Sequence, residues 1–145
     1  MSGLNTILAF VIGFMGAQIL KTIIVFSSSK KKITFKSFIE VLMRSGGMPS
    51  GHSAGFAALT TYIRFSCGID SIYFALAFCM ALIVIYDACN VRYAVGEQGK
   101  VLNALVKAAK LEDKRLKIVE GHTVLQVLAG IVFGVLIGIF TFLIF

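Results

Sequence analysis

Four apolar runs separated by polar segments organise this chain. They cover about residues 4–26, 50–66, 71–88 and 122–145. Each run is close to the length that an α-helix needs to cross a hydrocarbon core of roughly 30 Å. The pattern therefore predicts an all-α protein, a polytopic bundle of four transmembrane helices that forms a single integral membrane domain over residues 1–145.

Two polar segments between these runs also contain helical patterns. In 27–45, apolar residues recur at helical spacing and predict a short helix along the membrane interface. In 96–120, an apolar stripe beside several lysines predicts a basic amphipathic helix suited to the membrane surface. We therefore expect short interfacial helices in addition to the four spans.

Basic residues are distributed unevenly across the predicted spans. Twelve of the fourteen Lys and Arg residues lie in two connections, between the first and second runs and between the third and fourth. Because an excess of Lys and Arg marks cytoplasmic loops, this side is expected to be cytoplasmic, with both termini outside. Loops that face anionic lipid then explain the net charge of +7, and no nucleic acid partner is expected.

Composition agrees with a membrane location. The chain is 58% hydrophobic and 14% charged, far from the usage of soluble domains. Cys67, Cys79 and Cys89 form no Cys-x-x-Cys pair and have no histidine nearby at metal-ligand spacing. Neither a disulfide framework nor a metal site is therefore expected.

The stretch GGMPSGHSAG, residues 46–55, is the first candidate for chemistry. Pro49 fits the first turn of a helix, and the glycines allow backbone N–H groups to approach a bound group. With the positive end of the helix dipole, these N–H groups suit an anion such as phosphate. Ser50 can cap the helix or donate to the anion, and His52 can transfer a proton near neutral pH. The alternative is a turn that only begins a membrane helix.

The predicted topology gathers further polar residues at the same membrane face. These residues come from all four runs and are Lys21, His52, Asp87, Arg92 and His122. Two histidines beside several cations suggest phosphoryl transfer, in which one histidine attacks phosphorus and the other protonates the departing oxygen. No metal or other cofactor is required. Alternatives remain open, because Lys21 could snorkel to lipid headgroups, and Asp87 and Arg92 could form a helix-end ion pair.

Four blocks of the chain carry a resemblance to a known family. In order they are AQILK, GGMPSGHSA, YDACNVRYAVGEQ and GHTVLQVLAG. They resemble the small divergent membrane branch of the type 2 phosphatidic acid phosphatase superfamily, which also includes the vanadium-dependent haloperoxidases. The resemblance implies a helical phosphatase that needs no metal, with His122 as the nucleophile that forms phosphohistidine and His52 as the general acid. It also implies phosphate ligands at Lys21, Ser50 and Gly51.

Two arginines of the superfamily pattern are absent from their usual places. The first motif ends in Arg-Pro, which this chain lacks, and Arg44 or Arg92 is a candidate substitute. Arg44 directly precedes the glycine turn and could reach an anion there. The arginine expected six residues before the nucleophile is Leu116, and the neighbouring Lys117 is a candidate phosphate ligand.

A third departure concerns the residue that orients the nucleophile. The superfamily has an acidic residue four positions after the histidine, and this chain has Gln126. An amide oxygen can accept an imidazole N–H and fix its tautomer, but it cannot stabilise an imidazolium by charge. Asp87 or Glu120 is a candidate source of that charge.

We therefore expect a metal-independent phosphatase that hydrolyses a lipid or isoprenoid phosphate or diphosphate, with its site at the cytoplasmic face of a bacterial inner (plasma) membrane. The alternative is a catalytically weakened or inactive lipid-phosphate-binding protein or scaffold, and a weaker one is a transporter subunit. Gly130, Gly134 and Gly138 repeat every fourth residue, which favours close helix packing within or between protomers. We expect a homodimer.

Overall fold

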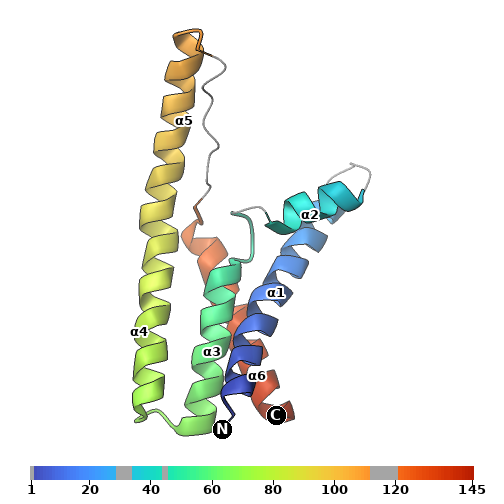
Figure 1. Cartoon of the computed structure of the whole chain (residues 1–145), viewed down its shortest axis with the longest axis vertical. Helices are drawn as coiled ribbons and strands as arrows, with labels where there is room; N and C mark the ends of the chain where they lie inside the picture. Colours follow the sequence, from blue (N-terminus) through green and yellow to red (C-terminus); the bar gives the residue numbers. More distant parts are fainter. Residues whose placement is uncertain (1, 29–33, 44–45, 112–120) are drawn as a thin grey trace.

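The computed structural model describes residues 2–28, 34–43, 46–111 and 121–145 (Figure 1). Within these ranges the regular structure is entirely helical, which confirms the predicted all-α class. The elements, in chain order, are α1 (Gly3–Ser28), α2 (Phe35–Met43), α3 (Gly51–Cys67), α4 (Ile72–Tyr86), the π-helical turn η1 (Asp87–Val91), α5 (Arg92–Ala108) and α6 (Val124–Ile144).

Helix α3 is the centre of the bundle and packs against α1, α4 and α6. Its closest approach is to α6, because Gly130, Gly134 and Gly138 face it. A Cβ atom at any of these glycines would collide with a backbone carbonyl oxygen of α3 or its N-cap. The glycine face therefore packs inside the protomer, and a homodimer cannot use it as the sequence had suggested.

Three helices among the described residues are long and apolar enough to cross a membrane: Gly3–Ser28, Ile72–Ala108 and Val124–Ile144. The run predicted at 50–66 does form a helix, α3, but its 17 residues are at the short end of what a bilayer requires. The structure thus supports three membrane helices, and a fourth crossing by α3 remains a prediction.

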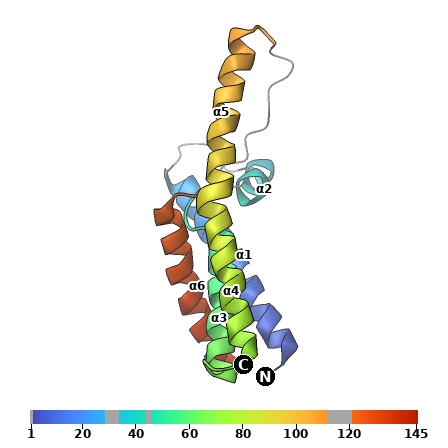
Figure 2. The same ribbon diagram turned by 90° about the vertical axis from the view of Figure 1, so that its left-hand side faces the viewer.

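The third predicted helix does not end near residue 88. Helix α4 continues through η1 into α5, and the combined helix extends well beyond the bundle (Figures 1 and 2). The basic amphipathic segment is therefore a prolongation of α4, whereas the sequence had suggested a separate surface helix. No proline interrupts this stretch, so the helix can propagate once it has formed.

Shorter features agree with their sequence signals. Residues 35–43 form the amphipathic helix α2 beside α1, although its place at a membrane interface remains a prediction. Ser71 caps the start of α4, since its hydroxyl oxygen accepts the N–H of Phe74 at 3.1 Å. Both described ends of the chain lie at the end of the bundle opposite α2 and α5 (Figure 1).

Candidate functional site

A cavity of about 580 Å³ lies beside the N-terminal end of α3. It is bounded by α1, α2, α3, the α4–η1–α5 helix and the segment that precedes α6. Six of the residues predicted for the site line it: Lys21, Gly51, His52, Asp87, Arg92 and His122. Residues from distant parts of the sequence thus converge on one space.

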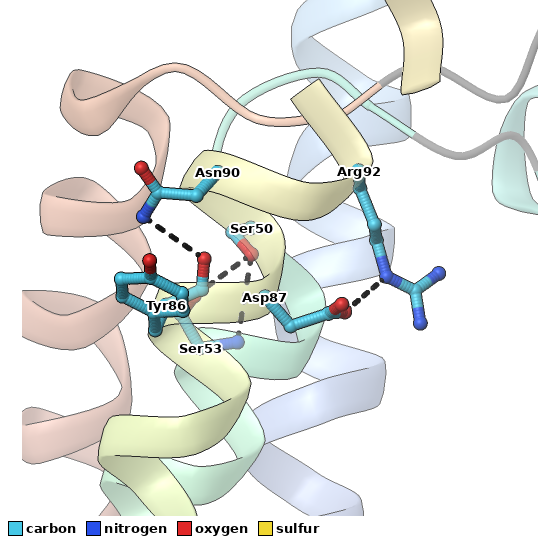
Figure 3. Close-up of polar contacts among 6 residues, drawn as sticks. All are labelled: Ser50, Ser53, Tyr86, Asp87, Asn90 and Arg92. Carbon is cyan, nitrogen blue, oxygen red and sulfur yellow. Dashed lines mark hydrogen bonds and ion pairs between the residues drawn. The ribbon is translucent and has the colours of Figure 1, made fainter. Parts of the chain in front are cut away.

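The glycine-rich loop leads directly into α3. Gly46 and Gly47 have φ values of 82° and 85°, a left-handed conformation that a residue with a Cβ atom adopts at a cost. Ser50 is the N-cap of α3, and its buried hydroxyl oxygen accepts hydrogen bonds from the backbone and side chain of Ser53 (Figure 3). Ser50 therefore caps the helix and is not among the residues that line the cavity. Pro49 precedes this cap and lies two positions before Gly51, the first helical residue, so the prediction that it belongs to the first turn was wrong.

His52 lies in the first turn of α3 with its ring exposed to the cavity. The ring meets Phe14 of α1 edge to face, with 5.3 Å between centroids. The aromatic contact therefore helps to fix the orientation of the His52 ring, and the residue remains exposed at the cavity.

His122 is held in one tautomer by the start of α6. Thr123 and Gln126 form a capping box, in which the Gln126 side-chain oxygen accepts the Thr123 N–H at 3.2 Å. The same oxygen lies 3.2 Å from Nδ1 of His122. Because an oxygen must face Thr123 N–H, Nδ1 is the donor, and Nε2 keeps the lone pair in the neutral ring.

Burial favours that neutral ring. His122 is 9% exposed, and burial is the main reason that its pKa is lowered from 6.5. Hydrogen bonds to Gln126 and the backbone of Gly47 oppose the shift, whereas Lys21 and His52 add to it. At neutral pH the ring is therefore in the form that can act as a nucleophile.

A π-helical turn positions the backbone of His122. In η1 the N–H of Arg92 bonds to the carbonyl of Asp87, five residues back. The carbonyl of Ala88, in the same turn, accepts the N–H of His122 at 3.1 Å. Gly121 makes this approach possible, because a Cβ there would collide with the backbone of Tyr93. The sequence reasoning missed Ala88 and Gly121; the glycine beside the histidine in GHTVLQVLAG was the available signal.

Asp87 and Arg92 form an ion pair on the cavity wall, with Nε and Oδ2 2.5 Å apart (Figure 3). The Asp87 carboxylate therefore pairs with the Arg92 guanidinium, and the Gln126 amide is the hydrogen-bond partner of the His122 side chain. That Asp87 supplies charge to His122 stays a prediction, since the partner of its carboxylate in the structure is Arg92. The ion pair does not remove either residue from the candidate site, because Asp87 and Arg92 both line the cavity.

Lys21 is a buried cation at the cavity, with 4% of its surface exposed. Its aliphatic part packs on Gly47, where an added Cβ would meet the lysine Cδ at 2.9 Å. The side chain thus lies under the glycine loop and does not snorkel outward. A buried cation in a membrane helix is costly and marks a functional site by default.

Two predicted phosphate ligands, Arg44 and Lys117, lie outside the described residues, as does Glu120. The described part of the chain contains no cluster of three or more His, Cys, Asp or Glu side chains suited to a metal ion. Groups at the cavity that suit an anion include Lys21, Arg92, the two histidines and the first turn of α3.

Comparison with known proteins agrees with the resemblance carried by the four sequence blocks. The family model described as "Divergent PAP2 family" matches residues 4–137. The chain is 36% identical over 136 residues to the "Uncharacterized membrane protein YuiD" of Bacillus subtilis (strain 168), with 83% of each chain covered. No solved structure matches the chain. By this match, which spans nearly its whole length, the chain belongs to the Divergent PAP2 family.

Proposed function

We propose that this protein is a membrane phosphatase that hydrolyses a lipid phosphate or diphosphate through a phosphohistidine on His122. The observation that carries the proposal is the cavity at which His52 and His122 meet two cations, Lys21 and Arg92. Membership of a family named for a phosphatase supports the same chemistry. The proposed substrates include isoprenoid phosphates, because the chemistry requires only a phosphate group attached to a membrane-soluble chain.

The proposed first step is an in-line attack by Nε2 of His122 on phosphorus. The nitrogen–phosphorus bond forms as the bond to the ester oxygen breaks, and His52 gives that oxygen a proton. Lys21, Arg92 and the N–H groups of the first turn of α3 stabilise the charge on the phosphoryl oxygens.

The proposed second step frees the enzyme. Water attacks the phosphorus of phosphohistidine while neutral His52 takes the proton of the water. The nitrogen–phosphorus bond then breaks, which returns His122 to its neutral form and releases phosphate. Throughout both steps the Gln126 oxygen accepts the Nδ1 proton, so it holds the ring although it brings no charge.

We place the site at the cytoplasmic face of a bacterial inner membrane, with both termini outside. The cavity lies at the end of the bundle from which α2 and α5 project, and these elements border the basic segments (Figure 1). The uneven distribution of Lys and Arg supports this orientation. A homodimer stays a prediction, and it would have to use a face other than the glycine face of α6.

A second candidate function is a non-catalytic lipid-phosphate-binding protein or scaffold. The observation that favours it is Gln126, a neutral partner where the superfamily has an acid. This arrangement could bind an anion beside His122 without stabilising the imidazolium that forms after attack.

Phosphate release in detergent micelles separates the two functions. The purified protein is expected to release phosphate from a lipid phosphate, and His122→Ala is expected to reduce this to background. His52→Ala should lower kcat by roughly 10²- to 10⁴-fold, because both the leaving oxygen and the attacking water lose their proton-transfer group. Equal rates in the parent and His122→Ala, or no release from either, would favour the binding protein.

A further inference from the structure

The cavity continues from its polar end along apolar walls. Phe14 and Met15 of α1 line one side, and Ile83 and Val84 of α4 line another. Ile83 precedes Asp87 by one helical turn, and Phe14 precedes Lys21 by two. The apolar residues on both walls therefore lie closer to the middle of the bundle than Lys21 and Asp87 do.

These two walls belong to helices that pack on the same neighbour. Helices α1 and α4 each pack against α3, and no comparable packing joins α1 to α4 in the described structure. In Figure 1 the two helices run on different sides of α3. Met15 and Ile83 are 40% and 68% exposed, so one residue of each wall is open to the surroundings of the bundle. The space between them is a groove that opens sideways.

A laterally open apolar groove beside a phosphate site suits an amphiphile. Its phosphate can reach the cations while its hydrocarbon chain stays in apolar surroundings. A fully water-soluble phosphate ester would leave the exposed side chains of Met15 and Ile83 without a contact from the ligand. The α1 and α4 segments on these walls are themselves helices apolar enough to cross a membrane, which places the groove opening against hydrocarbon.

We propose that the groove between Met15 and Ile83 is the entry route and binding subsite for the hydrocarbon chain of a lipid phosphate. This proposal rests on the proposed function, because the phosphate of the lipid has to lie between His52 and His122 for its hydrocarbon chain to occupy the groove. It assigns substrate selectivity to apolar residues of α1 and α4 that lie outside the catalytic group.

Ile83→Trp tests this subsite, with Leu82→Trp as the matched control. Both residues are exposed on α4 at the same depth, but only Ile83 lines the cavity. The substrates are dioleoyl phosphatidic acid, farnesyl phosphate and the chain-free ester p-nitrophenyl phosphate. Ile83→Trp should raise KM for the hydrolysed lipid about tenfold more than KM for p-nitrophenyl phosphate, because the indole fills the groove. An equal change for lipid and soluble substrates, or the same selectivity change in Leu82→Trp, would overturn the subsite.

A photoreactive lipid phosphate with a diazirine in its chain gives a readout independent of turnover. Labelling is expected in the α1 peptide around Met15 and the α4 peptide around Ile83, and it should fall when the phosphate is replaced by a hydroxyl. Labelling elsewhere, or labelling that does not depend on the phosphate, would overturn the subsite. A parent protein that hydrolyses no substrate but is labelled in the groove would retain the subsite and refute the phosphatase.

Discussion

The side-chain oxygen of Gln126 accepts two hydrogen bonds, one from the Thr123 N–H and one from the His122 ring. At the residue scale this oxygen fixes the tautomer of the proposed nucleophile. Gln126→Leu removes the acceptor and should lower kcat by roughly 10²- to 10⁴-fold, by analogy with loss of tautomer control in a catalytic triad. Gln126→Glu keeps both the acceptor and the capping box, so it should retain activity.

Measuring kcat and KM separately tests this role of Gln126. A positioning role predicts a loss in kcat with little change in KM for Gln126→Leu, together with recovery in Gln126→Glu. If the leucine variant keeps the parent kcat, the amide does not control the ring.

The protonation of His122 gives a second prediction at the residue scale. Burial lowers its pKa from 6.5, and attack requires the unprotonated ring. As pH falls through the lowered pKa, the ring gains a proton, so kcat/KM should decline with a midpoint below pH 6.5. The carboxylate of Gln126→Glu favours the protonated ring and should move this acid limb upward. The measurement is kcat/KM from about pH 4.5 to 8, and a parent acid limb above 6.5 would contradict it.

At the element scale, the π-helical turn joins α4 to the start of α6. The Ala88 carbonyl in this turn accepts the His122 N–H, and Gly121 lets the two segments approach closely. Gly121→Ala should therefore destabilise the fold by about 1–3 kcal/mol and reduce kcat, because the added methyl group displaces His122 from Ala88. Thermal unfolding in detergent measures the stability, and Gly3→Ala is the control, since nothing lies within 4 Å of a Cβ there. Equal melting temperatures for both variants would refute the role of this contact.

The elements also show what local sequence can and cannot predict. Caps at Ser71 and Thr123 depend on residues within one turn, so a cap before α4 was predictable from sequence alone. The order and direction of the apolar runs were enough to predict that His52 and His122 lie at the same end of the bundle, and both line the cavity. The π-helical turn was not predictable, because the partner of the Ala88 carbonyl comes from a residue 34 positions later. The Asp87–Arg92 ion pair, by contrast, joins residues five positions apart and was one of the alternatives that the sequence offered.

At the scale of the whole molecule, the glycine face of α6 determines how tightly α3 is enclosed. Spacing alone could show that Gly130, Gly134 and Gly138 share one face, but not which helix covers it. The structure assigns that face to α3 of the same chain. Helix α3 is therefore supported by α6 on one side while its His52 side remains open to the cavity.

Whether α3 crosses the membrane decides the topology of the whole protein. The α3–α4 turn lies at the same end of the bundle as both described termini, and α5 projects from the other end (Figure 1). Single cysteines placed at Ser2, Asp70 and Lys107, all exposed, report these ends once the native cysteines are replaced by serine. With four crossings, a membrane-impermeant maleimide should label the first two positions in intact cells and Lys107→Cys only after permeabilisation. Labelling of Ser2→Cys and Asp70→Cys from opposite sides would show that α3 does not cross, and labelling of Lys107→Cys in intact cells would reverse the orientation and place the cavity outside.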